Sequence, residues 1–307
     1  MSIQDTTALA TPENGANLRV IFYNIYGYDN DFPITDQDPD AYNGSRGGPI
    51  TLRHDLQMDI FSHYSPDILG FQEYVNTSHN GLTPRLRELG YCEVPYQLPE
   101  GDEVNDTPIF YKDSSVKLIE GGYRLYRKWM EGVEVSCNNS YTKSLSWAVF
   151  EQKCNGHRFI FVSTHLMYTA DWQNYGAYEQ ARCANVSELF TELDEVRKKY
   201  PELPVILGGD LNTTPDCDSF KKLQERFTWM QYAPNVNADP YGFKGYSTYS
   251  FEKEEYAVCP LPPETGHGID HVLYSGDVKV TNYLTLTDRA SLLASDHCPK
   301  LADIVLN

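Results

Sequence analysis

The chain has 307 residues, and its 41% hydrophobic content is sufficient for a substantial core. Its 43 acidic and 25 basic side chains give a formal net charge of -18 at pH 7. This charge repels a polyanion that approaches without a screening cation, so long nucleic acid is possible but disfavoured as a partner.

The first quarter of the chain predicts a strand, a helix and a second strand. Residues 1–17 are polar, contain no signal-like apolar run and are expected to form a disordered lead-in. Residues 18–25 are short, aromatic and β-branched, which is typical of a buried strand. After a polar loop over 29–49, apolar residues at every fourth position predict a helix over 52–64, and residues 67–71 return as a strand.

The rest of the chain is rich in short β-prone segments separated by turn residues. Strands are predicted over residues 108–112, 116–119, 144–151, 157–164, 204–207, 269–274, 278–285 and 301–306. Apolar residues spaced by three and four predict an amphipathic helix over 178–200, and a shorter helix is predicted over 220–227.

Mixed strands and helices of this kind predict an α/β sandwich in which two sheets pack face to face and helices cover their outer faces. The chain contains no low-complexity linker, so a single domain is expected over residues 18–307. The Gly-, Tyr- and Pro-rich stretch 242–268 is interpreted as long loops within it.

The seven cysteines are scattered singly, without a CxxC pair. An odd number of isolated thiols argues against a closed disulfide framework and favours a reducing, cytoplasmic location. The sequence has no segment with the length and apolarity of a membrane span, and we expect a monomer.

Polar residues recur at the ends of the predicted apolar strands, where a rigid scaffold can direct them into one cleft. They are Asn24, Gln72-Glu73, Thr164-His165, Asp210 with Asn212, and Asp296-His297, while Asp270 interrupts a sixth apolar run. Each alone has an ordinary structural explanation as a turn residue, helix cap or core histidine. Together they favour a functional cluster, because buried carboxylates are costly unless they bind a metal or a partner. An oxygen-rich set of this kind suits Mg²⁺ or Mn²⁺ better than zinc.

Four short motifs, LGFQE, STHL, GGDLN and SDHCP, resemble those of the endonuclease/exonuclease/phosphatase superfamily in order and separation. The resemblance extends from Leu18 to Leu306. It implies a four-layered α/β sandwich and divalent-metal hydrolysis of phosphate esters, in members as different as nucleases, sphingomyelinases and inositol-polyphosphate phosphatases. It does not identify the substrate.

By this resemblance, Glu73 is the main Mg²⁺ ligand, and Asn24 and Asp296 contribute to the metal and its waters. A departure from the family pattern is Tyr26, because many nuclease-like members carry an acidic residue at that position. This leaves open whether one or two metal ions bind.

The resemblance also implies the catalytic groups. Asp210 would orient and deprotonate the attacking water, with Asn212 holding it in place. His297 would contact a phosphate oxygen or assist proton transfer, with its tautomer fixed by Asp270, and His165 would contact the phosphate from the other side.

Other side chains are open to two interpretations. The aromatic residues Trp147, Tyr168 and Trp172 could line a pocket for an apolar or ring-bearing group, although ordinary core or loop positions are the simpler interpretation. Lys143 and Arg53 could reach a substrate phosphate, but the sequence favours solvated surface positions for both.

The sequence therefore predicts a Mg²⁺-dependent phosphoesterase acting on a small or lipid-like phosphate mono- or diester. One alternative is an endo- or exonuclease acting on DNA or RNA. Two others are a catalytically inactive binding module of the same fold and a zinc hydrolase.

Overall fold

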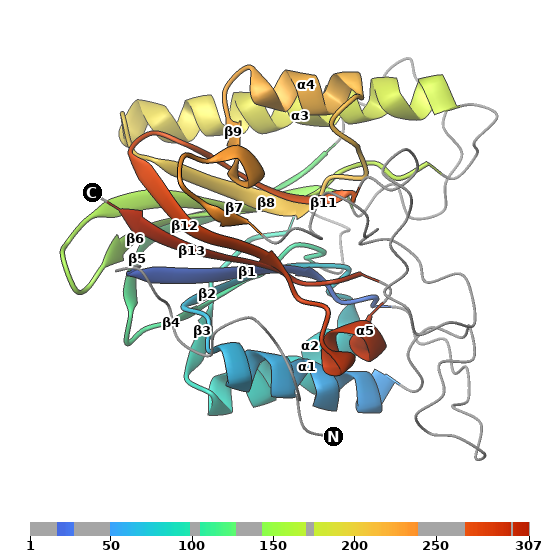
Figure 1. Ribbon diagram of the computed structural model, residues 1–307, viewed down its shortest axis with the longest axis vertical. Helices are drawn as coiled ribbons and strands as arrows, with labels where there is room; N and C mark the ends of the chain where they lie inside the picture. Colours follow the sequence, from blue (N-terminus) through green and yellow to red (C-terminus); the bar gives the residue numbers. More distant parts are fainter. Residues whose placement is uncertain are drawn as a thin grey trace.

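Two β-sheets form the centre of the described part of the chain (Figure 1). The computed structural model describes residues 17–27, 50–98, 105–126, 143–169, 175–238, 268–295 and 297–306. The predicted loops over 29–49 and 242–268 lie almost wholly outside these residues, as does the predicted lead-in except for Asn17.

The first sheet has seven strands in the order β10-β12-β13-β1-β2-β4-β3. Its members are β1 (Leu18–Asn24), β2 (Ile68–Gln72), β3 (Tyr91–Glu93), β4 (Ile109–Lys112), β10 (Asn237–Ala238), β12 (Val278–Thr285) and β13 (Lys300–Leu306). The pairs β1–β2 and β10–β12 are parallel and the other pairs are antiparallel, so the sheet is mixed.

The second sheet has six strands in the order β5-β6-β7-β8-β11-β9. Its members are β5 (Val116–Leu125), β6 (Ser144–Gln152), β7 (Arg158–His165), β8 (Val205–Asp210), β9 (Thr228–Trp229) and β11 (Asp270–Ser275). Among the described strands of this sheet, only β7 and β8 are parallel neighbours, and this pair positions two of the predicted site residues.

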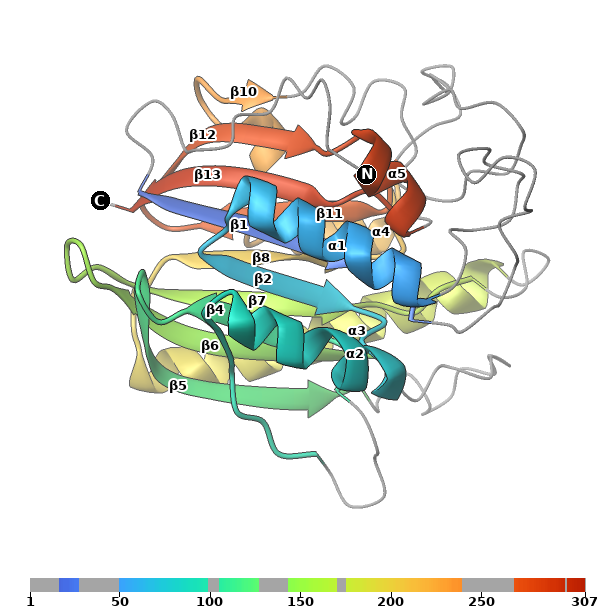
Figure 2. The same cartoon turned by 90° about the horizontal axis from the view of Figure 1, so that it is seen from below.

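Helices cover the outer face of each sheet (Figures 1 and 2). The seven-stranded sheet is covered by α1 (Ile50–Tyr64), α2 (Asn76–Glu88) and α5 (Arg289–Ala294). The six-stranded sheet is covered by α3 (Tyr175–Lys199) and α4 (Asp218–Gln224), and a 3₁₀ turn, η4, spans Met230–Tyr232. The four-layered α/β sandwich that the sequence predicts is therefore confirmed.

The two sheets approach closely because glycines face a stacked pair of phenylalanines between them. The ring of Phe22 in β1 stacks on Phe161 in β7, with centroids 4.7 Å apart and planes inclined by 5°. A Cβ atom placed on Gly70 or Gly208 would lie 2.8 Å from the Phe22 ring. A larger residue at either position would therefore push the sheets apart at this point.

A buried ion pair joins strands at the end of the first sheet remote from the predicted site. Arg19 in β1 donates from Nε and Nη2 to the two carboxylate oxygens of Asp303 in β13, at 2.7 and 2.9 Å. Asn282 in β12 donates to the same carboxylate at 2.9 Å. Both charged side chains are 1% exposed, so their stability depends on this full pairing.

The structure differs from the sequence-based prediction at several elements. The amide of Asn17, the last residue of the predicted lead-in, donates to Ile304 O at 3.0 Å. Helix α2 was not predicted because Gly81 and Pro84 interrupt its apolar pattern, although it forms and is buried along one side. Among the described residues, no helix has the length and apolarity needed to cross a membrane.

Candidate active site

The strand register brings the polar ends of five strands to one edge of the sandwich. In the first sheet, Asn24 at the end of β1 lies beside Gln72 at the end of β2. In the second sheet, Asp210 at the end of β8 lies between His165 at the end of β7 and Asp270 at the start of β11. Because parallel strands end at the same edge, the two sheets present these groups together.

Asp210 is the meeting point of this cluster. Its Oδ2 atom accepts a hydrogen bond from Asn24 Nδ2 at 3.0 Å, a contact that crosses between the two sheets. Its Oδ1 atom accepts from the backbone amide of Asn212 at 2.9 Å, and the Asn212 side chain donates in turn to Leu166 O at 3.0 Å. The Asp210 carboxylate is thus held in one orientation.

His165 lies between two carboxylates and a lysine. Its Nδ1 atom is 2.8 Å from Asp106 Oδ2, and its Nε2 atom is 3.3 Å from Asp210 Oδ2. The Lys143 ammonium is 2.5 Å from Nε2 and 3.1 Å from Nδ1, so it sits against the edge of the ring. All four side chains are buried, and charged groups buried in this way must balance one another.

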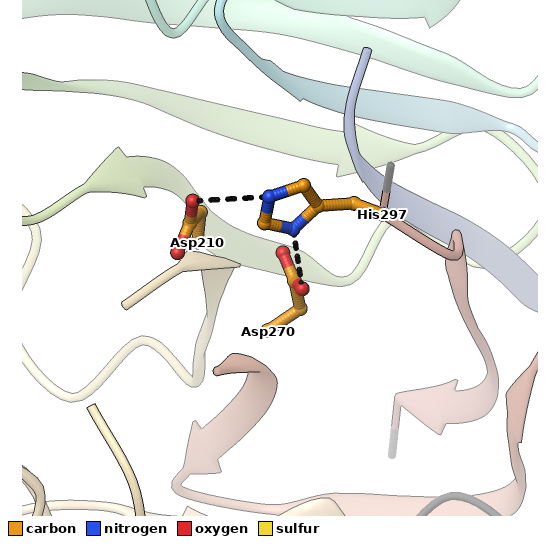
Figure 3. A group of neighbouring side chains, drawn as sticks. All are labelled: Asp210, Asp270 and His297. Atoms are coloured by element: carbon orange, nitrogen blue, oxygen red, sulfur yellow. Dashed lines mark hydrogen bonds and ion pairs between the residues drawn. The ribbon is translucent and has the colours of Figure 1, made fainter. Parts of the chain in front are cut away.

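His297 forms a second imidazole–carboxylate pair beside Asp210 (Figure 3). Its Nδ1 atom is 2.8 Å from Asp270 Oδ2, and its Nε2 atom points toward Asp210, 3.8 Å from Oδ2. Ser295 Oγ accepts from the His297 amide at 3.1 Å and donates to Asn24 O at 2.7 Å. The loop before β13 is therefore fastened to the end of β1.

The charges of these groups strongly shift the pKa values of Asp210 and His165. Burial raises the pKa of Asp210, but the neighbouring His165, His297 and Lys143 lower that pKa more, to well below the usual range of an aspartate. Burial and Lys143 lower the pKa of His165, but Asp106 and Asp210 outweigh them and raise it to about 9. The surroundings therefore favour the ionised carboxylate of Asp210, and the two neighbouring carboxylates favour the protonated imidazole of His165.

The backbone around the cluster is also unusual. Tyr26, Glu73 and Asn212, which follow β1, β2 and β8, have φ angles of 52°, 58° and 48°. Non-glycine residues rarely adopt this left-handed conformation, which costs about 1 kcal/mol or more each. Such residues collect at sites where the chain must turn sharply to aim side chains.

Most of the predicted site residues come together. The residues that contact one another at this edge are Asn24, His165, Asp210, Asn212, Asp270 and His297. Glu73 follows β2 directly, and its half-buried side chain belongs to the same edge by its place in the chain. Asp296 lies outside the described residues.

Two members of the cluster were misjudged or missed from the sequence. Lys143 is 3% exposed and contacts His165, so the predicted surface position is wrong. Asp106 was not a candidate because it precedes a strand, β4, whereas most of the candidates follow one. Its signal was an Asn-Asp-Thr turn, in which Asn105 Oδ1 accepts from the Thr107 amide at 2.9 Å.

Two further side chains that the sequence left open, Arg53 and Trp147, are buried against other parts of the fold. Arg53 is buried and donates to the carbonyl oxygens of Ile25 and Tyr26, so its predicted surface position is also wrong. Trp147 is buried in the core between the second sheet and α3, and its Nε1 atom donates to Glu192 at 3.0 Å. Trp172 lies outside the described residues.

The donor atoms present suit a hard divalent cation. Asp210, Asp270 and His297 each offer a ligand atom, and these atoms all lie within 4.8 Å of one another at buried positions. Within the described residues this group contains carboxylate oxygens and one imidazole but no thiolate. Oxygen-rich sets of this kind favour Mg²⁺ or Mn²⁺.

Comparison with known proteins places this geometry in a family. A family model described as "Endonuclease/Exonuclease/phosphatase family" matches residues 22–297. A probable RNA exonuclease from Schizosaccharomyces pombe is 26% identical over 233 residues, which cover 74% of this chain and 42% of that protein. The chain spans less than two thirds of this relative and of two further curated proteins, from Drosophila melanogaster and Arabidopsis thaliana.

Solved structures show the same fold at low sequence identity. An endonuclease/exonuclease/phosphatase from Bacteroides vulgatus matches with a TM-score of 0.68 and 20% identity over 94% of this chain and 99% of that one. A mannosyl-6-phosphatase from Bacteroides thetaiotaomicron matches with a TM-score of 0.63 and 18% identity over 94% and 100% of the two chains.

Proposed function

Because the chain belongs to the Endonuclease/Exonuclease/phosphatase family, whose members hydrolyse phosphate esters, we propose that it is a Mg²⁺-dependent phosphoesterase acting on a small phosphate ester. The observation that carries this proposal is the buried cluster around Asp210, in which two imidazoles, a lysine and carboxylates meet the Asn24 amide from the other sheet. Such a cluster supplies the charge neutralisation and water orientation that phosphoester hydrolysis needs.

The proposed metal ligands are Glu73, Asn24 and Asp296, and Asp210 and Asp270 would hydrogen-bond to waters of the bound ion. Asn24 supports this assignment, since its Nδ2 atom donates to Asp210 while its Oδ1 atom accepts from the Tyr26 amide at 3.0 Å. A second lone pair of that oxygen can face a cation. Bound Mg²⁺ would neutralise charge on the phosphate oxygens.

The residues of this chain then divide the remaining work. Asp210 has a very low pKa, so we propose that it mainly orients the attacking water rather than taking its proton at equilibrium. His297, whose Nδ1 atom faces Asp270 and whose Nε2 atom lies 3.8 Å from Asp210 Oδ2, would offer Nε2 to the reacting phosphate. His165 and Lys143 together place positive charge on the opposite side, where a non-bridging phosphate oxygen would be bound.

A small or lipid-like ester is proposed over a long polyanion because of the net charge of -18. The structural neighbour named as a mannosyl-6-phosphatase is consistent with a small-molecule substrate on this fold. A second candidate is hydrolysis at an RNA end, favoured by the S. pombe relative named as a probable RNA exonuclease. Binding only the end of a single strand brings fewer phosphates near the protein than binding along a duplex, which reduces the charge repulsion.

A substrate panel separates these candidates. The purified protein is incubated with Mg²⁺ and, in parallel, bis-p-nitrophenyl phosphate, sugar phosphates, inositol phosphates, sphingomyelin, plasmid and RNA oligonucleotides. Faster turnover of a small ester supports the first proposal, and rapid RNA shortening at physiological salt favours the second. Absence of turnover on every member would contradict both.

Metal dependence is tested on the best substrate of that panel. Activity should vanish in EDTA and return with Mg²⁺ or Mn²⁺. Activity that survives Mg²⁺ depletion but is lost with a zinc-selective chelator would point instead to a zinc hydrolase.

A further inference from the structure

An ion pair at the start of α3 lies behind the candidate active site without contacting its reactive groups. Arg182 Nε is 2.8 Å from Glu179 Oε2, three residues earlier on the helix. The Arg182 side chain is 0% exposed and that of Glu179 is 13% exposed. A buried pair of this kind rarely adds stability over an apolar one, so its presence suggests another role.

Arg182 holds the segment that follows His165. Its Nη1 atom donates to Met167 O at 3.1 Å and to Thr169 Oγ1 at 2.9 Å. One turn later on α3, Asn185 Oδ1 accepts from the Met167 amide at 3.0 Å. In the segment 166–169, both the amide and the carbonyl of Met167 are therefore hydrogen-bonded to side chains of this helix.

Glu179 holds the segment that follows Asp210. Its Oε1 atom accepts from the backbone amide of Ser219 at 2.7 Å, in the first turn of α4. Cys217, which precedes this helix, makes no side-chain capping bond, so the carboxylate from α3 satisfies an amide that the helix leaves open. Ser219 Oγ is 2.6 Å from Thr213 Oγ1, which extends the link to residues 211–217.

The two segments are also bonded to each other, through Asn212 Nδ2 and Leu166 O at 3.0 Å. We infer that the Glu179–Arg182 pair is a positioning device that sets the placement of His165 relative to Asp210 by holding both segments at once. The inference rests on the proposed function. A displacement of about 1 Å at such groups can cost on the order of 10²-fold in rate.

The test uses Glu179→Gln, Arg182→Lys and Arg182→Gln in the full-length protein. Glu179→Gln and Arg182→Lys are the mild variants, because each keeps the side-chain shape or charge while weakening the pair. The matched control is Glu195→Gln with Lys198→Gln, an exposed pair at the same spacing on α3, with Nζ 2.6 Å from Oε1. With bis-p-nitrophenyl phosphate and Mg²⁺, kcat should fall about 10- to 100-fold in the test variants while KM stays within about twofold.

A second readout does not depend on activity. Amide hydrogen exchange of residues 166–169 and 211–217 should be faster in the test variants than in the wild type and the control. Unchanged exchange in both segments would overturn the inference, as would faster exchange with unchanged kcat. If the wild type hydrolyses no substrate of the panel, the proposed function fails. Unchanged exchange would then still refute the pair's role in holding both segments.

Discussion

Both oxygens of the Asp210 carboxylate are engaged within the buried cluster. One accepts from the Asn212 amide, and the other faces Asn24, His165 and His297. A carboxylate with so many positive or donating neighbours is stabilised in its ionised form, which agrees with its depressed pKa. Its proposed contribution is therefore the orientation of water and the electrostatic balance of two imidazoles.

Replacing Asp210 by Asn or His297 by Ala should lower kcat by on the order of 10²-fold or more, because both groups are proposed to act in the transition state. Steady-state kinetics on the best panel substrate, with thermal unfolding as a folding check, tests this. The control is Asp218→Asn, whose side chain is 82% exposed on α4 and which should retain wild-type kcat. Unchanged turnover in both site variants would remove the proposed mechanism.

Asp106 offers a prediction at a residue that the sequence did not reveal. Its carboxylate contacts His165 Nδ1 at 2.8 Å and contributes to the raised pKa of that imidazole. Asp106→Asn should weaken the orientation and charge of His165 and reduce kcat by about 10-fold or more. Asp113→Asn, an exposed change just beyond β4, serves as the control and should have no effect. Equal kcat values for the two variants would contradict a role for Asp106.

At the scale of elements, α1 and α2 pack around a buried neutral histidine. The His54 ring lies against Gly81, where an added Cβ atom would be 2.5 Å from it. Burial, and then the charges of Arg53 and Arg85, lower the pKa of His54 to about 4. Protonation therefore favours the unfolded chain.

The lowered pKa of His54 predicts how the free energy of unfolding depends on pH. The contribution of neutral His54 is fully present above its unfolded pKa of about 6.5 and is lost as the pH falls toward about 4. Over that window this group lowers the free energy of unfolding by at most about 1.4 kcal/mol per pH unit. Urea titrations should show a shallower acid dependence in His54→Gln but not in His157→Gln, which changes an exposed histidine. Parallel pH profiles for His54→Gln and wild type would refute the assignment.

Sequence patterns predicted elements well where burial imposes a period. All ten strands predicted from the sequence are present, and the helix predicted over 178–200 is α3. Helix α2 was not predicted because few apolar residues, including Leu82 and Leu86, make its buried contacts, and Gly81 and Pro84 lie among them. Tertiary packing rather than local propensity explains its formation.

The sequence predicted which residues form the candidate site better than it predicted the contacts between them. Strand ends pointed to Asn24, His165 and Asp210, because a strand end is a position visible in sequence. The burial of Lys143 and Arg53 was not visible, since a buried cation is stable only beside partners supplied by distant segments. Such partners appear only when the fold brings them together.

At the scale of the whole molecule, the Arg19–Asp303 pair fastens β1 to β13 far from the proposed chemistry. Arg19→Met would leave the Asp303 carboxylate buried without its main partner and should destabilise the protein by about 3–5 kcal/mol in urea unfolding. Arg19→Met combined with Asp303→Leu should recover much of this loss. Lys153→Met, which removes a partly exposed pair with Asp113, should cost less than about 1 kcal/mol. A similar loss in Arg19→Met and Lys153→Met would contradict the prediction.

The hydrogen bond from Asn24 to Asp210 spans the interior seam between the two halves of the sandwich. The turnover rate should therefore fall when the two sheets separate even slightly at this contact. At low denaturant concentrations, we expect kcat to decrease while far-ultraviolet circular dichroism still reports intact strands and helices. A protein that loosens along this seam would stop working before it visibly unfolds.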